Sequence, residues 1–310
     1  MPSVPASETA SRAAVKSPAA GILWMVLSCA LLSGVAICGR YAALEGVAVL
    51  QIVFLRLVFA AVAMAPMAAV RGLEMVRTRH WRIYLVRVAA GSLAMTTWFA
   101  AVALSPVGEV TAIGFLMPLF ATLGAALFLG ERVRWRRWAA VGIGFCGMLV
   151  ILRPGLVPAS PGTWLAVVSA MAMAVSSLFI KRLADRDDPD KVVLITTLMM
   201  TAVALGPGLW VWQPLTLELW AVFALMGALG MLGHITLARA LRAADASIVM
   251  GADFARLPFA VLFGWLLFGE LIDLWTWIGA ALIFAAAFYA ARREREVRPR
   301  SSVGSTSDVP

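Results

Sequence analysis

The amino-acid sequence predicts an all-α integral membrane protein, with ten transmembrane helices arranged as two inverted five-helix repeats. Three observations predict it: an apolar composition, ten continuous apolar stretches, and a pattern of proline, glycine and glutamate that occurs twice. Of the 310 residues, 62% are hydrophobic and only 14% are charged, whereas a soluble domain has roughly half its residues apolar and about a quarter charged. Such a chain lacks the polar residues needed to cover a soluble surface, so we expect it to lie in a lipid bilayer.

The predicted spans follow from the apolar stretches. A transmembrane helix needs about 20 mostly apolar residues. Ten stretches qualify, at 21–39, 48–70, 83–104, 108–129, 138–153, 162–180, 192–212, 219–238, 247–268 and 274–291. Their hydrophobicity is continuous rather than alternating, which argues against a transmembrane β-barrel. We interpret residues 1–20 as a disordered cytoplasmic tail and residues 292–310 as a basic, disordered cytoplasmic tail.

Positive charge predicts the orientation. Lys and Arg are enriched in cytoplasmic loops. If the N-terminus is cytoplasmic, 21 of the 26 Lys and Arg fall in cytoplasmic segments. Arg56, Arg87 and Arg256 lie within spans, and only Arg40 and Arg153 lie in segments on the outer side of the membrane. Both termini are therefore predicted to be cytoplasmic, in a multi-pass protein of the cell inner membrane. The same distribution argues against nucleic acid as a partner, because the basic residues lie in short gaps between spans rather than on one soluble face.

Two stretches of the chain share a pattern. Residues 103–131 read "ALSPVGEVTAIGFLMPLFATLGAALFLGE" and residues 240–270 read "ALRAADASIVMGADFARLPFAVLFGWLLFGE". Both begin with Ala-Leu, carry a proline in mid-span and end in Gly-Glu. The matched residues are Pro118 with Pro258, and Gly130-Glu131 with Gly269-Glu270. The chain therefore divides into two halves of five spans, residues 21–153 and 162–291.

An odd number of spans in each half predicts that the second half enters the membrane in the opposite direction. The loop after Glu131 reads "RVRWRR", whereas the loop after Glu270 reads "LID" and holds no base. Inverted halves are typical of secondary transporters, in which the substrate site lies between the halves near the bilayer midplane.

The ten spans, with "PLF" before "LGERV" closing the fourth and "PFAVLFGWLLFGE" closing the ninth, resemble the drug/metabolite transporter superfamily, EamA type. The resemblance covers residues 20–292. It implies a helix bundle with a central cavity lined by the first four helices of each half, and carriers or exporters of small metabolites. The stretch "WFAAVALSPVGEVTAIGFLMPLF" is most similar to members that handle amino-acid-type compounds, S-adenosylmethionine or riboflavin.

Two charges lie within the ninth predicted span. Asp253 and Arg256 are three residues apart, so they share one helix face. A charge in mid-membrane costs about 2.5–3.5 kcal/mol on insertion scales, and such charges usually face a cavity or pair with one another. We expect Arg256 to bind an anionic substrate group and Asp253 an amine or a proton; the alternative is a structural ion pair.

Further polar residues lie within spans. Arg56, about eight residues into the second span, is a second candidate substrate anchor or a tether to a backbone carbonyl. Arg87, near the inner boundary, is expected to extend to the interface. Trp98 is a candidate for stacking on a flat or cationic substrate; the alternative is packing against lipid or a neighbouring helix. His234, in the eighth span, is a substrate or proton candidate, or hydrogen-bonded packing.

Three glutamates lie at predicted helix ends. Glu109 opens the fourth span, where a negative charge favours the helix dipole; a role in proton coupling, with Asp253 and His234, is the alternative. Glu131 and Glu270 end helices, where the dipole is unfavourable. We therefore expect each to have a structural partner, either an arginine or the N-terminus of a neighbouring helix.

Other signals are rejected. "GIGFCG" at 142–147 matches a dinucleotide-binding fingerprint, but it lies within a span and lacks the strand before it; small residues there suit close helix packing. Cys29, Cys38 and Cys146 are interpreted as buried small hydrophobic residues. No clustered metal ligands occur, and we expect neither a metal nor another cofactor.

These observations predict an inner-membrane secondary transporter rather than an enzyme. The expected cargo is a small organic metabolite of amino-acid type, with export as one direction; the alternative is an uptake carrier for S-adenosylmethionine or riboflavin. Proton coupling, and a monomer or a homodimer, are both compatible with the sequence. An intramembrane enzyme would need clustered acids or histidines, and a channel a continuous polar pore, so both are less favoured.

Overall fold

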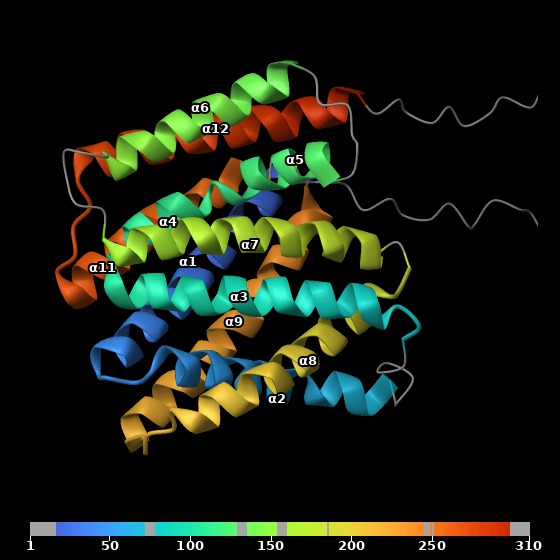
Figure 1. The fold of residues 1–310 in the computed structure, drawn as a ribbon, viewed down its shortest axis with the longest axis vertical. Helices are drawn as coiled ribbons and strands as arrows, with labels where there is room; N and C mark the ends of the chain where they lie inside the picture. The colour runs from blue at the N-terminus through green and yellow to red at the C-terminus, as the bar shows by residue number, and fades with distance from the viewer. Residues whose placement is uncertain are drawn as a thin grey trace, which may run out of the picture.

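The computed structural model describes residues 17–71, 78–128, 135–153, 160–184, 186–244, 249 and 251–297. Within these ranges all regular structure is helical (Figure 1). The elements are α1 (Pro18–Leu44), α2 (Val49–Arg71), α3 (Trp81–Leu104), α4 (Val107–Gly114), α5 (Met117–Phe128), α6 (Trp135–Leu152), α7 (Pro161–Ala184), α8 (Pro189–Trp210), α9 (Leu217–Ala243), η2 (Asp253–Ala255), α11 (Arg256–Phe268) and α12 (Leu274–Val297). The prediction of an all-helical protein is confirmed for this part of the chain.

Length and hydropathy identify the helices that suit a bilayer. Within the described residues, six helical segments are long and apolar enough to cross one, at Pro18–Leu44, Trp81–Leu104, Val107–Gly124, Pro161–Ile180, Asp190–Trp210 and Leu217–Ala243. Three shorter apolar helices accompany them, at Val49–Ala65, Trp138–Leu152 and Leu274–Tyr289. Many large apolar side chains are exposed on the outside of the bundle, for example Leu23, Val62, Leu93, Trp210 and Leu266, as expected of a surface that lipid covers.

The main helix pairs join elements that are far apart in the sequence. α1 packs on α9, α2 on α8, α3 on α7 and α6 on α12 (Figure 1). Contacts at the ends show that these pairs are antiparallel, since the end of one helix meets the start of its partner. The end contacts are Tyr41 with Glu218, Gln51 with Gln213, Ser105 with Ser160, and Arg153 with Asp273.

Two predicted spans are interrupted rather than continuous. The fourth breaks at 115–116, between α4 and α5, and in the ninth a short 3-10 turn, η2, precedes α11. Pro118 and Pro258 explain both breaks, because proline has no N–H and clashes with the preceding turn in a helix interior. Each proline instead lies in the first turn of the following helix, where an N–H would lack an intrahelical partner anyway. The matched prolines of the sequence therefore begin half-helices.

Gly147, the last glycine of "GIGFCG", packs α6 closely against α12. A Cβ on Gly147 would lie 2.7 Å from the carbonyl oxygen of Gly279 on α12, and a Cβ on Gly279 would lie 2.6 Å from that of Gly147. Glycine at both positions therefore lets the backbones of α6 and α12 touch. Of the cysteines, Cys29 and Cys38 are buried as predicted, but Cys146 is exposed. That prediction was wrong because Cys146 lies beside, and not on, the face that packs on α12.

Candidate functional site

Asp253 and Arg256 form an ion pair inside the bundle. Nη2 of Arg256 lies 2.6 Å from Oδ1 of Asp253, and the two side chains are 33% and 20% exposed. η2 places Asp253 just before α11, and Arg256 begins that helix. Nε of Arg256 is buried and has no hydrogen-bond partner among the described residues. The prediction that the two residues share a face is confirmed, and one donor of Arg256 remains available.

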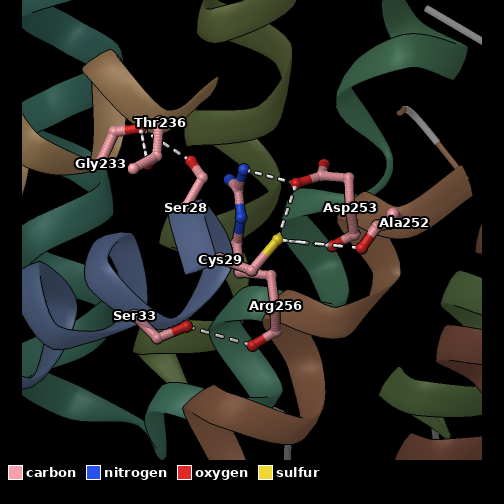
Figure 2. A network of polar contacts seen from close by, with 8 residues as sticks. All are labelled: Ser28, Cys29, Ser33, Gly233, Thr236, Ala252, Asp253 and Arg256. Atoms are coloured by element: carbon pink, nitrogen blue, oxygen red, sulfur yellow. Dashed lines mark hydrogen bonds and ion pairs between the residues drawn. The ribbon is translucent and has the colours of Figure 1, made fainter. Parts of the chain in front are cut away.

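α1 supplies small polar side chains to this pair (Figure 2). The thiol of Cys29 lies 3.7 Å from Oδ1 of Asp253 and 3.6 Å from its carbonyl oxygen. The hydroxyl of Ser33, one turn further along α1, donates to the carbonyl oxygen of Arg256 at 3.2 Å. Sequence reasoning missed Cys29 and Ser33, because nothing in the sequence indicates that the first helix packs against the ninth predicted span.

The other side of α1 is fastened to α9. The hydroxyl of Ser28 donates to the carbonyl oxygen of Gly233 at 2.8 Å, and the hydroxyl of Thr236 donates to the same oxygen at 2.9 Å (Figure 2). Gly233 allows this close approach, since a Cβ there would lie 2.8 Å from Leu32. α1 is thereby held between α9 and the Asp253–Arg256 pair.

Arg56 extends from α2 toward α3 without a carboxylate partner among the described residues. Its guanidinium lies over the ring of Phe99, 5.7 Å from the centroid, and Nη1 lies 3.2 Å from the sulfur of Met95. Neither contact is a strong acceptor, since a thioether accepts weakly and a ring face provides only a cation–π attraction. The alternative of a tether to a backbone carbonyl is not seen among the described residues. Arg56 therefore has N–H donors free for a ligand.

His234 lies on α9, within electrostatic reach of both arginines. Its side chain is exposed, although it is in the middle of α9, and both Arg56 and Arg256 act on it electrostatically. A histidine on the lipid-facing surface would not lie close to arginines of two other helices. His234 therefore lies within electrostatic reach of arginines on α2 and α11.

Aromatic side chains surround the two helix breaks. Trp98 packs against two core clusters of the bundle, and its ring is 3.1 Å from the position of a Cβ on Gly114. Phe115, at the first break, lies 5.6 Å from Phe254 of η2, centroid to centroid. Phe254 in turn lies 4.4 Å from Phe284. The two breaks therefore meet through aromatic rings, and Trp98 lies beside them.

Polar contacts fasten one end of the bundle. Arg40 on α1 pairs with Glu270 at 2.6 Å, and Glu270 also accepts from the backbone N–H of Val107 at 3.1 Å. Glu109, in the first turn of α4 as predicted, accepts from the hydroxyl of Thr163 at 2.6 Å. The predicted partners of Glu270 are thus both present: an arginine and a helix N-terminus. Glu131 lies outside the described residues.

Arg87 does not extend to the interface as expected. A Cβ on Gly91, one turn further into α3, would overlap Nη1 of Arg87, so the side chain points away from the start of the helix. Its Nε is buried and has no hydrogen-bond partner among the described residues. The expectation failed because Gly91 leaves room beside α3, and that room cannot be read from one segment alone.

In the described part of the chain, metal ligands and pockets are the next features to compare with the ion pair. Within the described ranges, no three His, Cys, Asp or Glu side chains gather closely enough to hold a metal ion. A pocket of about 70 Å³ lies between α2, α3 and α8, and it is lined by Leu50, Val53, Ser92, Thr96, Val203, Ala204 and Pro207. This pocket does not include the Asp253–Arg256 pair. The candidate site is therefore the charged cluster, by which we mean Asp253 and Arg256 together with Arg56 and His234.

A bundle of lipid-compatible helices that encloses an ion pair, an unpaired arginine and paired helix breaks defines a multi-pass membrane transport protein. Comparison with known families agrees. Residues 19–153 and residues 160–292 each match the EamA-like transporter family. The chain therefore belongs to the EamA-like transporter family, within the drug/metabolite transporter superfamily.

Individual relatives are also transporters. The chain is 37% identical over 235 residues to a riboflavin transporter of Rhizobium johnstonii, covering 74% of this chain and 76% of that one. It is 32% identical over 294 residues to a riboflavin transporter of Vibrio cholerae, covering 90% and 98%. An S-adenosylmethionine uptake transporter of Rickettsia bellii is 23% identical over 283 residues, covering 91% and 97%.

A solved structure shares the fold. A chain titled only as the crystal structure of a protein superposes with a TM-score of 0.59 at 19% identity, covering 91% of this chain and 100% of that chain. At this identity the likeness concerns the fold alone.

Proposed function

We propose that this protein is a secondary transporter of riboflavin or a closely related flavin in the bacterial inner membrane. The observation that carries the proposal is the similarity to two riboflavin transporters, at 37% identity over 235 residues and 32% over 294. This similarity favours the uptake alternative of the sequence analysis over an amino-acid-type cargo.

The chemistry of the cluster supports a flat, uncharged cargo. Riboflavin has a planar three-ring system with carbonyl and N–H groups on one edge and a hydroxylated chain. Aromatic rings stack or meet edge to face with such a system. Phe254 directly follows Asp253 in η2, and Trp98 lies beside Gly114 at the first helix break. The free N–H donors of Arg56 can bind the carbonyl oxygens of the ring system. A hydrogen bond from a charged group stabilises by about 1.5–3 kcal/mol.

Electrostatics argues against S-adenosylmethionine, the second candidate. Its sulfonium and ammonium groups are positive and its carboxylate is negative, so the molecule as a whole is a cation. Asp253 is already paired with Arg256, and Arg56 has no carboxylate among the described residues. The cluster is therefore net positive and would repel a cation, while a neutral compound meets no such cost.

The architecture proposed for transport is two inverted halves, 21–153 and 162–291, that rock about a fixed site. The antiparallel pairs and the two matches to one family model support it. The basic segments support cytoplasmic termini. Because both halves belong to one chain, a monomer suffices. In this scheme Arg56, Arg256 and Trp98 contact the substrate, and Asp253, His234 or Glu109 carries a proton.

Transport into proteoliposomes tests the proposal. Purified protein should accumulate riboflavin, detected by its own fluorescence. Arg56→Met should raise the half-saturating concentration about 10- to 100-fold, as expected for the loss of about 1.5–3 kcal/mol. Arg82→Met is the matched control, because Arg82 is an exposed residue at the start of α3. Accumulation of S-adenosylmethionine but not of riboflavin would refute the proposal.

A further inference from the structure

A second unpaired arginine lies between the two halves, outside the charged cluster. Arg87 is on α3, which packs on α7. Its guanidinium has no hydrogen bond or carboxylate among the described residues, and its Nε is buried. Arg87 is partly buried and its Nε is fully so, and a charge that loses solvent without gaining a partner is unfavourable. The empty protein thus bears a cost at Arg87 that a bound anion would remove.

Ser176 on α7 faces the same point. A Cβ built on Gly91 would overlap Nη1 of Arg87 and would lie 3.4 Å from Oγ of Ser176. Ser176 is 1% exposed, and its hydroxyl has no partner among the described residues. A buried hydroxyl normally has a hydrogen-bond partner. Beside the two groups lies the sulfur of Met200, 3.4 Å from the same Cβ position, but a thioether is a weak acceptor, and neither Nε of Arg87 nor the hydroxyl of Ser176 has a hydrogen-bond partner among the described residues.

Two other serines on α7 form the hydrogen bonds that Ser176 lacks. Ser177 donates to the carbonyl oxygen of Ala174 within its own helix at 2.7 Å. Ser169 donates across the interface to the carbonyl oxygen of Ala94 on α3 at 2.8 Å. Ser176 makes neither kind of bond. Its hydroxyl is turned toward the space beside Gly91 rather than to the nearest backbone acceptor.

The position of Arg87 along α3 places it in the interior. Arg87, Gly91 and Trp98 are spaced by four and seven residues, which puts them on one helix face. Arg87 is six residues after Trp81, about 9 Å along the helix, and its side chain points further in. Because the headgroup layer is only about 5–7 Å thick, a lipid phosphate would have to leave that layer to reach Arg87.

We propose that Arg87 and Ser176 form a subsite for an oxyanion, the carboxylate or phosphate of a small organic anion moving between the halves. Arg87 provides the charge and planar N–H donors that suit such groups. Ser176 provides a hydroxyl donor, and Gly91 provides the space. The subsite rests on the transporter fold and does not depend on riboflavin being the substrate.

Binding of inorganic phosphate to the purified, full-length protein tests the subsite. The protein is placed in phosphatidylcholine nanodiscs, and phosphate replaces chloride at constant ionic strength while the unfolding temperature is measured. A ligand that binds the folded state raises that temperature saturably. The parent should show a saturable rise. Arg87→Met should abolish it, Ser176→Ala should weaken the affinity several-fold, and Arg82→Met should leave it unchanged.

Several outcomes would overturn the subsite. These are no saturable rise in the parent, or the same rise in the parent and in Arg87→Met. If Arg87→Met does not fold, the phosphate affinities of Arg87→Lys and Ser176→Ala test the subsite instead. An unchanged phosphate affinity in both variants contradicts the proposal. If phosphatidylglycerol in the nanodiscs abolishes the effect of phosphate, and the effect returns only when that lipid is removed, the subsite binds a lipid headgroup. This outcome would reject the proposal that it binds a small anion.

Discussion

Arg40 and Glu270 are joined by two contacts, from Nη2 at 2.6 Å and from Nε at 2.8 Å, although they lie 230 positions apart. Gly269, with φ of +67°, ends α11 and turns the chain so that Glu270 follows at once. A carboxylate at a helix C-terminus is unfavourable, but here the arginine and the N-terminus of α4 compensate for it. The Gly-Glu motif therefore stabilises the packing of the end of α11 against α1 and the start of α4.

Removing one partner of this pair should destabilise the protein strongly. Both side chains are only 13% exposed, and loss of one member of a buried pair costs about 3–5 kcal/mol. Arg40→Met and Glu270→Gln should each lower the free energy of unfolding by this order. Thermal unfolding in detergent measures it, and the double variant should lose clearly less than the sum of the single losses. Additive losses would show that the two residues act independently.

Asp253 and Arg256 are either a structural pair or a substrate site, and a double-mutant cycle separates the two. Asp253→Asn and Arg256→Met should each lower the unfolding temperature, because each leaves an uncompensated charge. The double variant should recover much of that stability. We expect its riboflavin transport to remain at least 10-fold below the parent, since the groups that contact the substrate are gone.

The same variants address proton coupling. If Asp253 carries the proton, Asp253→Asn should flatten the dependence of transport on pH, while Glu109→Gln should not. A profile that overlays the parent would remove Asp253 from that role. Recovery of transport together with stability in the double variant would make the pair purely structural.

Gly147 and Gly142 offer a matched test of helix packing within α6. Gly147→Ala should destabilise by about 1–3 kcal/mol, the range for overpacking, since its Cβ would meet backbone atoms of α12 that cannot move aside. Gly142→Ala should stabilise by about 0.4–1 kcal/mol, because no atom lies within 4 Å of the added Cβ. Unfolding temperatures that shift in the same direction for both variants would contradict the proposed contact.

Asp273 should give a small, acid-dependent contribution to stability. Burial raises its pKa, but hydrogen bonds from Thr276 and the charge of Arg153 outweigh this and hold the pKa below its usual value of 3.8. A lowered pKa means that the stabilisation is present above pH 3.8 and is lost as the pH falls through the folded-state pKa.

Asp273→Asn should therefore cost about 1 kcal/mol or less at pH 7, as expected for a partly exposed ion pair. Chemical unfolding at several pH values measures it, and the difference from the parent should shrink toward zero below pH 3.8. A difference that stays constant with pH would assign the effect to the helix cap and not to the charge.

Several features could be predicted because they follow from local chemistry. Long apolar stretches require helices in lipid, and Pro118 and Pro258 mark interruptions wherever the helices pack. Asp253 and Arg256 are three residues apart, and this spacing alone brings them together. The expectation of an arginine or a helix N-terminus beside Glu270 followed from the dipole, although the sequence did not say which.

Only the tertiary structure decided which distant residues meet. Cys29 and Ser33 contact the ion pair because α1 packs beside α11, and Arg87 turns inward because Gly91 leaves space against Ser176. Such contacts depend on how helices cross, and small residues spread over several helices determine those crossings. By itself the sequence determined the membrane setting, the helices and the charges that had to find partners. The packing determined which charges were paired and which, at Arg56 and Arg87, remained available for a ligand.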